Sequence, residues 1–374
     1  LFRSRTASNA SRPGGKLGAP YARAGAMATG EPGAQGGGLA RWVERHPLAA
    51  LLLALAIVLF LWLVLADWPE ELERWLGRKR VFVSALFNGI TLGGLYFLVA
   101  TGFTLIFGLM RNVNLAHGSL YLFGGYLAYS TVQATGLWLP SFLVAFVLVA
   151  IVGLLLQVLV FRHMEGQELR QTLVTIGLSI VFADLMLWVW GGDFYQIPTP
   201  EWLAGPIDTP IVLDVRPNGE AVYLRYPRVR LVIFAASVVI GVLLWLAINK
   251  TRVGMLIRAG VDDREMLAAS GVPIQLLFAL VFAFGAGLAG MAGVVGGTFQ
   301  SLSPGEDTRF LLASLVVVIV GGLGSIPGAA LGALLIGLAE QFGSVYLPTY
   351  AIVFSFLIMV LVLAFRPQGL LSVR

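Results

Sequence analysis

Cysteine is absent from this 374-residue chain, and charged residues are scarce. Without cysteine the chain forms no disulfide bond, no thiolate metal site and no cysteine nucleophile. Its three histidines, His46, His117 and His163, lie far apart in the sequence, so the sequence predicts no metal site. Charged residues make up 12% of the chain and hydrophobic residues 58%, whereas about 25% of a soluble domain is charged. This composition indicates a membrane protein.

Several long segments contain no Asp, Glu, Lys or Arg. A membrane-spanning helix needs about 20 apolar residues, and the longest segments have room for two crossings, or for one crossing and a re-entrant piece. The alternating segments of about 10 residues that mark a transmembrane β-barrel are absent. We therefore predict an all-α polytopic membrane protein with roughly 8–10 transmembrane or re-entrant helices. The charge-free segments are 47–66, 81–110, 112–161, 231–249, 267–305, 310–339 and 341–365.

The net charge of +5 belongs to the N-terminal tail. Residues 1–46 contain seven basic and two acidic residues, which leaves 18 of each sign in the rest of the chain. Nucleic-acid binding is therefore not implied. The tail is rich in Gly, Ala and Arg without hydrophobic periodicity, which predicts disorder. Residues 47–67 are interpreted as an extra N-terminal transmembrane helix; a cleaved signal peptide is the alternative, although a clean small-residue cleavage site is lacking.

Basic loops predict which parts of the chain face the cytoplasm. Loops 162–170 and 250–272 are both basic, and two crossings separate them, so both are placed on the cytoplasmic side. The long segment 191–230 between them is then external. The same count places Arg78-Lys79-Arg80 outside, in conflict with the rule.

Polar residues interrupt the apolar sequence at Asn114-Leu115-Ala116-His117-Gly118-Ser119. Polar groups are costly in hydrocarbon and usually face protein, water or a passing solute. Hydrogen bonding between helices is the alternative role, and we favour it for two of the candidates, Asn88 and Thr91. The cluster suggests a transport protein. For His117, a role in the path and packing at a helix break are equally supported, and His117→Ala is predicted to impair uptake more than folding. The candidate translocation-path residues are Asn88, Thr91, Asn114, His117, Gly118 and Ser119, with Glu340 near a membrane face.

Glycine is abundant, with 45 residues. Most of these glycines are interpreted as sites of close helix packing. The segment 321–328 is too rich in glycine for an unbroken helix, and it predicts a broken or re-entrant element at membrane depth. A shared Gly-Ser in segments 114–124 and 324–332 raises the hypothesis of an internal repeat. The helix-breaking residues are Gly322, Gly324, Pro327 and Gly328.

The loop 250–272 predicts a short helix between two spans. Asp262 and Asp263 are placed to cap it, Gly271 ends it, and Pro273 opens the next span. From the residues alone, a helix that docks on a partner and a well-capped connection are equally supported.

Ordered motifs resemble the permease subunits of branched-chain amino acid ABC importers. Asn114-Leu115-Ala116-His117-Gly118 is one such motif, and Gly321-Gly322-Leu323-Gly324-Ser325-Ile326-Pro327-Gly328-Ala329 is another. The resemblance implies an importer permease domain at residues 81–372, whereas residues 1–80 lie outside it. Asp184 departs from the uncharged polar residue expected in its helix. The other motifs are residues 88–96, 102–108, 175–179, 251–254, 257–259, 268–272 and 365–371.

The resemblance implies a transport subunit and not an enzyme. Its expected partners are a second homologous permease subunit, two cytoplasmic ATPase subunits, an external solute-binding protein and membrane lipid, in a bacterial-type plasma (inner) membrane. The sequence contains no Gly-x-x-x-x-Gly-Lys-Ser/Thr phosphate loop, so we expect no cofactor on this chain and ATP use by the partner subunits. The implied ATPase-docking residues are Thr251, Gly254, Arg258, Ala259, Asp263, Ala268 and Gly271.

The residues leave three alternatives to amino acid import. The same kind of importer permease for urea, short amides or another small polar solute is the nearest. An ion-coupled secondary transporter would need buried coupling carboxylates, and only Asp184 lies deep in a predicted span. A membrane enzyme would need a catalytic group of residues at the bilayer surface, and the sequence offers none.

Overall fold

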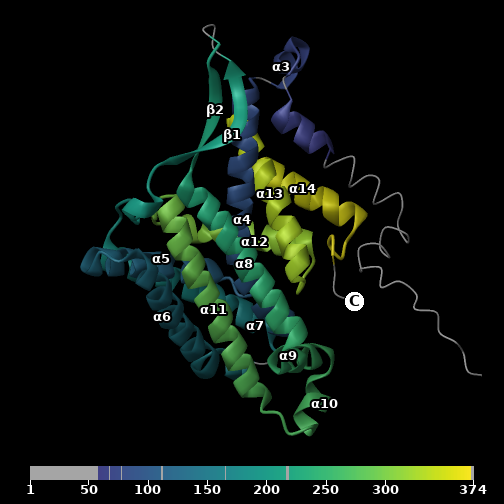
Figure 1. The fold of residues 1–374 in the computed structure, drawn as a ribbon. Coiled ribbons are helices and arrows are strands. Elements are labelled where there is room, and N and C mark those ends of the chain that lie inside the picture. The colour runs from purple at the N-terminus through teal and green to yellow at the C-terminus, as the bar shows by residue number, and fades with distance from the viewer. Residues whose placement is uncertain are drawn as a thin grey trace, which may run out of the picture. The chain divides into compact units, whose positions relative to one another are not determined.

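The computed structural model describes residues 58–66, 68–76, 78–110, 113–164, 166–215 and 219–371 (Figure 1). The chain divides into two compact units, Leu1–Leu61 and Trp62–Arg374, and the fold described below is that of the second. The predicted disordered tail, residues 1–46, lies outside the described residues. Most of the predicted helix 47–67 does so too, although residues 58–65 are helical.

The described chain is almost entirely helical, as predicted. Seven helical segments within the described ranges are long and apolar enough to cross a membrane, namely α4, α6, α7, α8, α11, α13 and residues 348–365. The 19-residue α5 and the 16-residue α12 pack among them. The helices are α3 (Glu70–Leu76), α4 (Lys79–Met110), α5 (His117–Thr135), α6 (Trp138–Leu159), η1 (Phe161–Met164), α7 (Glu168–Trp190), η2 (Glu201–Leu203), α8 (Arg228–Lys250), α9 (Arg252–Asp262), α10 (Arg264–Ala269), α11 (Ile274–Phe299), α12 (Glu306–Gly321), α13 (Ile326–Tyr346), η3 (Pro348–Tyr350) and α14 (Ala351–Phe365).

Helix α4 is the centre of the bundle, and it packs against α8, α11, α12 and α13. Its apolar window is 89% buried, whereas those of the outer helices α6, α7 and α8 are at most 22% buried. Glycines let the backbones approach: a Cβ atom on Gly93 would lie 2.9 Å from the carbonyl oxygen of Ala333, and one on Gly102 would lie 2.4 Å from that of Gly285. Close approach through small residues is the usual basis of helix association in membranes.

A two-stranded antiparallel hairpin was not predicted from the sequence. It consists of β1 (Pro206–Val215) and β2 (Ala221–Pro227) and lies in the segment 191–230 that was predicted to be external. Leu213 and Leu224 of the hairpin pack with Val83 near the start of α4. The ammonium group of the buried Lys79 donates to the carbonyl oxygen of Val212 over 2.9 Å. The basic loops had placed Lys79 on the external side, in conflict with the rule that basic residues face the cytoplasm. The hairpin gives Lys79 a hydrogen-bond acceptor at that end of the bundle.

The opposite end of the bundle carries α9 and α10 (Figure 1). Leu105, near the end of α4, packs with Leu267 of α10 and Leu277 of α11, and Ile257 of α9 joins this cluster. The hairpin and the α9–α10 segment therefore sit at the two ends of the same central helix, as the predicted topology requires.

Candidate functional site

The turn before α5 is built by Asn114. Its side-chain Oδ1 accepts from the backbone N–H of Ala116 over 3.0 Å, and its carbonyl accepts from the N–H of His117 over 3.2 Å. The N–H of Leu115 donates to Thr175 Oγ1 of α7 over 3.1 Å. The polar residues of this motif thus fix the start of α5 against α7.

His117 is fully buried between α5 and α4. Its Nε2 donates to the carbonyl oxygen of Val99 over 3.0 Å, since a carbonyl only accepts. The imidazole meets the ring of Phe103 edge to face, with 5.4 Å between centroids. His117 of α5 therefore connects this helix to Val99 and Phe103 of α4.

Gly118 and Ser119 contact the first turn of α12. Ser119 Oγ donates to Asp307 Oδ2 over 3.3 Å, and both side chains are buried. A Cβ atom on Gly118 would lie 2.0 Å from the carbonyl oxygen of Asp307. Glycine is therefore required here by the distance between α5 and α12.

Asn88 and Thr91 form a separate polar group with the hairpin and α8. The Tyr226 hydroxyl donates to the carbonyl oxygen of Phe87 over 2.9 Å and lies 2.8 Å from Thr91 Oγ1, which is left as the donor to it. Burial raises the pKa of Tyr226 above its ordinary value, so the phenol stays neutral. Arg230 of α8 donates to Asn88 Oδ1. The predicted path residues therefore form two separate groups. Asn88 and Thr91 lie near the hairpin, and the other group at the start of α5 consists of Asn114, His117, Gly118 and Ser119.

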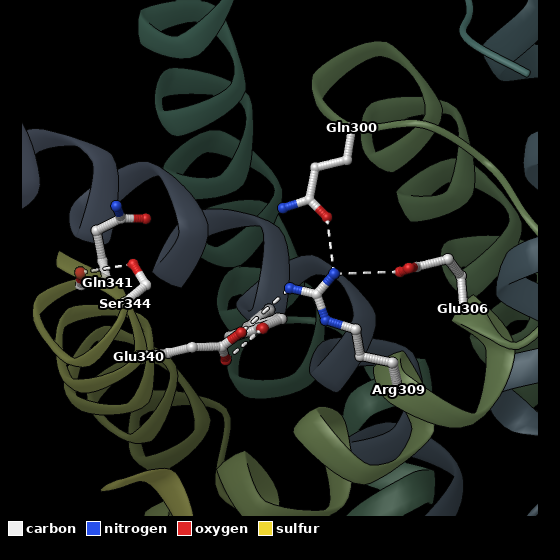
Figure 2. A network of polar contacts seen from close by, with 7 residues as sticks. Gln300, Glu306, Arg309, Glu340, Gln341 and Ser344 are labelled. Carbon is white, nitrogen blue, oxygen red and sulfur yellow. Dashed lines mark hydrogen bonds and ion pairs between the residues drawn. The ribbon is translucent and has the colours of Figure 1, made fainter. Parts of the chain in front are cut away.

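Glu340 belongs to a polar network that the sequence did not predict (Figure 2). Arg309 is its centre: Nη2 donates to Glu340 Oε1 over 3.1 Å, and Nη1 lies 3.4 Å from Glu306 Oε2 and 3.3 Å from Gln300 Oε1. The Tyr96 hydroxyl of α4 donates to Glu340 Oε2 over 2.6 Å. The available signal was the charged first turn of α12, with Glu306, Asp307 and Arg309 ahead of an apolar run.

An aromatic layer connects this network to α5. The ring of Phe310 lies 5.9 Å from that of Tyr96 and 4.2 Å from that of Tyr121, measured between centroids. All three side chains are buried. Within the described ranges, no group of three or more His, Asp or Glu side chains is placed to hold a metal ion. The site is thus one of ion pairs and aromatic rings.

The predicted docking loop contains two short helices where the sequence predicted one. Thr251 caps α9 by accepting from the N–H of Gly254 over 3.1 Å, and Asp263 caps α10 by accepting from that of Met266 over 2.9 Å. Asp262 ends α9, so only Asp263 occupies the capping position. Gly271, with φ of +81°, follows α10.

The surface of this loop combines apolar and basic side chains. Val253, Met255 and Met266 are 58–66% exposed. Arg258 donates to Asn249 Oδ1 over 2.9 Å. Of the two remaining predicted docking residues, Ala268 is exposed and Ala259 is half-buried.

The glycine-rich segment forms the turn between α12 and α13. Gly322 and Gly324 have φ of +108° and +79°. Ser325 Oγ accepts from the N–H of Gly328 over 3.1 Å, and Pro327 lies in the first turn of α13. The break thus separates two neighbouring helices that pack against each other.

The seven long apolar helices define the described chain as a polytopic helical membrane protein. The family model "branched-chain amino acid transport system / permease component" matches residues 85–363. The chain therefore belongs to this permease family.

Curated relatives match along most of their length. The chain is 29% identical over 307 residues to the high-affinity branched-chain amino acid transport system permease protein LivH of Escherichia coli K12, covering 78% of this chain and 96% of LivH. It is 30% identical over 303 residues to the permease protein BraD of Pseudomonas aeruginosa, covering 78% of this chain and 96% of BraD. The ribose import permease protein RbsC of Escherichia coli K12 is 24% identical over 279 residues, covering 68% of this chain and 76% of RbsC. No solved structure matches the chain.

Proposed function

We propose that this chain is the membrane subunit through which an ATP-driven importer passes branched-chain or related amino acids, delivered by an external solute-binding protein. The observation that carries the proposal is the family match across residues 85–363. The names of LivH and BraD support this class of solute. Similarity to a ribose import permease keeps another small polar solute, including urea or a short amide, as the second candidate.

Residues 81–372 act in this proposal as the permease domain. The domain pairs with a second homologous permease subunit and with two cytoplasmic ATPase subunits. The chain itself binds no cofactor, and ATP is hydrolysed on the partners. Residues 47–67 supply an extra N-terminal membrane helix that precedes the family domain.

The translocation path is proposed to follow the polar residues of α4 and α5. Asn88 and Thr91 lie toward the hairpin end, and the path continues through Asn114, His117, Gly118 and Ser119. The buried side chains among them are hydrogen bonded between helices or within the turn before α5. A solute therefore passes only when α4, α5 and α12 move apart, and the work for that movement comes from the ATPases.

The α9–α10 segment is proposed to dock on the ATPase subunits. Its two capped helices give a fixed shape, and its exposed Val253, Met255 and Met266 give an apolar surface. Arg258→Glu reverses a charge on this surface. We expect about fivefold weaker retention of the ATPases, in line with about 1 kcal/mol for an exposed charge.

The measurement is co-purification of the ATPases with the tagged permease from membranes. Arg225→Glu is the matched control, because Arg225 is an exposed arginine on the hairpin at the other end of the bundle. If the Arg258→Glu permease and the control retain the same amount of ATPase, α9 does not dock on the ATPase through Arg258. Gene neighbours encoding an ATPase, a second permease and a binding protein identify the proteins to co-express, and a binding assay on that binding protein identifies the solute.

Asp184 is not placed to couple an ion in a secondary transporter. Asp184, the carboxylate that lies deep in a predicted span, is exposed on the surface of α7. A coupling carboxylate is instead expected to face the bundle interior or a water-filled cavity.

A further inference from the structure

Three charged side chains that are partly exposed gather where the start of α12 meets α13. Glu306 and Arg309 come from the first turn of α12, and Glu340 comes from α13 (Figure 2). Ionisable residues are expensive within a membrane protein and are usually functional there. The roles proposed above for the turn before α5 and for the α9–α10 segment do not account for these charged residues.

The Arg309 contacts are long for ion pairs. Its nitrogen atoms lie 3.1 Å and 3.4 Å from the two glutamates, whereas a well-formed charge-assisted N–H···O bond is about 2.7–2.9 Å long. The Arg309 side chain is also 41% exposed. A guanidinium group that is shared between two carboxylates and partly exposed can exchange one carboxylate for another.

The charges around Arg309 do not balance. Among the described residues that contact it, Glu306 and Glu340 supply two carboxylates against the one guanidinium group of Arg309. An excess of negative charge attracts an ammonium group, whereas Arg309 offers a planar fork that suits a carboxylate. Both charged ends of an α-amino acid therefore find a partner within this group.

The aromatic layer lies directly beside these charges. Phe310 follows Arg309 in α12, and its ring contacts those of Tyr96 and Tyr121. The Arg309 guanidinium itself lies 5.8 Å from the centre of the Phe310 ring. An apolar solute side chain that enters beyond the charged groups would meet these rings next.

We propose that Arg309, with Glu306 and Glu340, recognises the carboxylate and ammonium groups of a zwitterionic amino acid as it enters the permease. Arg309 exchanges its glutamate partners for the solute carboxylate, and the released glutamates hold the ammonium group. This inference rests on the proposed function, because it takes an amino acid as the solute.

The test is uptake of L-leucine into proteoliposomes that hold the complete importer, supplied with its loaded binding protein. Arg309→Gln removes the guanidinium group that is proposed to bind the carboxylate of the solute. Glu340→Gln removes the negative charge on α13 but keeps an oxygen that accepts from Tyr96. We expect each variant to lower the initial rate about tenfold or more, as for loss of a charged hydrogen bond. Arg309→Lys keeps the charge without the fork, and we expect a raised half-saturating concentration of loaded binding protein. Arg225→Gln is the control and keeps the wild-type rate.

The double variant Arg309→Glu/Glu340→Arg separates recognition from a purely structural ion pair. It preserves the link between α12 and α13 but reverses its direction. Because Glu306 then faces a second carboxylate and Tyr96 loses its acceptor, we expect the double variant to recover part of the thermal stability lost in Arg309→Glu alone and none of its uptake. Restored uptake would overturn the proposal, and so would unchanged uptake kinetics in Arg309→Lys.

Wild-type uptake is measured in parallel and decides the proposed function by itself. If the wild-type complex assembles with the ATPases but transports no amino acid, amino acids are excluded as the transported solute. If the wild-type complex transports L-leucine and the Arg309 variants do so equally well, the recognition role of Arg309 is contradicted and the proposed function is not.

Discussion

Buried polar side chains in this bundle act as links between helices. The Thr91 hydroxyl reaches Tyr226, His117 reaches the Val99 carbonyl, and Ser119 reaches Asp307. A polar group buried without a hydrogen bond is costly, so each of these contacts favours one particular packing of its two elements. Polar residues at these positions therefore have a structural role in this conformation, whatever they contact during transport.

Gly118→Ala is predicted to destabilise the permease. Replacing glycine by alanine usually favours a helix, but here the new Cβ atom would lie 2.0 Å from the Asp307 carbonyl oxygen. Separating α5 from α12 should cost about 1–3 kcal/mol, as for overpacking in other interiors. The measurement is the midpoint temperature of thermal unfolding in detergent.

Gly177→Ala is the matched control for Gly118→Ala. Gly177 lies on the outer helix α7, and among the described residues no atom outside its local backbone comes within 4 Å of an added Cβ. Its variant should unfold at the wild-type temperature or slightly above it. Equal midpoints for both variants would mean that α5 and α12 do not meet at Gly118.

His117→Ala is now expected to lower stability as well as uptake. The sequence alone predicted a larger effect on uptake than on folding. The imidazole is fully buried and packs on Phe103, and removing a large buried side chain leaves a cavity that costs about 2–5 kcal/mol. Uptake per folded molecule, together with the yield of folded protein, separates the two effects. A wild-type yield with lost uptake would favour the path role alone.

At the scale of elements, the C-terminal segment closes the end of α12. The N–H groups of Leu370 and Leu371 donate to the carbonyl oxygens of Val320 and Gly321, each over 2.9 Å. The last carbonyls of a helix have no partner within it, so this segment satisfies them where α12 stops. The motif 365–371, which the resemblance singled out, thereby gains a physical role.

Gly369→Ala is predicted to loosen this closure. Gly369 has φ of +82°, and an added Cβ atom would lie 2.5 Å from the Cα atom of Gly322. We expect faster amide hydrogen exchange at Leu370 and Leu371 and a lower unfolding temperature, because the N–H groups of these two residues lose their acceptors on α12.

Gly205→Ala controls for the backbone conformation of Gly369. Gly205 has φ of +86°, and no described atom beyond its chain neighbours lies within 4 Å of an added Cβ. Both variants carry the cost of a left-handed alanine, about 1–2 kcal/mol, but only Gly369→Ala meets another backbone. If hydrogen exchange at Leu370 and Leu371 is the same in both, the C-terminal segment does not hold the end of α12.

At the scale of the whole molecule, the hairpin and the α9–α10 segment are predicted to face opposite sides of the membrane. The chain contains no cysteine, so a single introduced cysteine gives an unambiguous label. Tyr223→Cys on the hairpin and Met255→Cys on α9 replace side chains that are 49% and 60% exposed. A membrane-impermeant maleimide should label the first in intact cells and the second only after permeabilisation. Labelling of both from outside would contradict the predicted topology.

Much of the fold followed from local sequence patterns. The apolar runs predicted the membrane helices, Asp263 and Gly271 predicted the limits of α10, and the glycines near residue 322 predicted where α12 ends. These features depend on residues close together in the chain. The hairpin did not follow, because its strands are held by Lys79 and Val83 of a distant helix as well as by each other.

The sequence by itself determined that this chain is a helical membrane permease, because hydrophobic length and the order of family motifs are properties of the chain alone. Only the tertiary structure decided which polar residues meet. Glu340 lies 31 residues from Arg309, and Lys79 lies 133 residues from the Val212 carbonyl. Those pairs depend on the register in which whole helices pack. That register is set by the many close contacts of glycines such as Gly93 and Gly102 along α4, which no local pattern specifies.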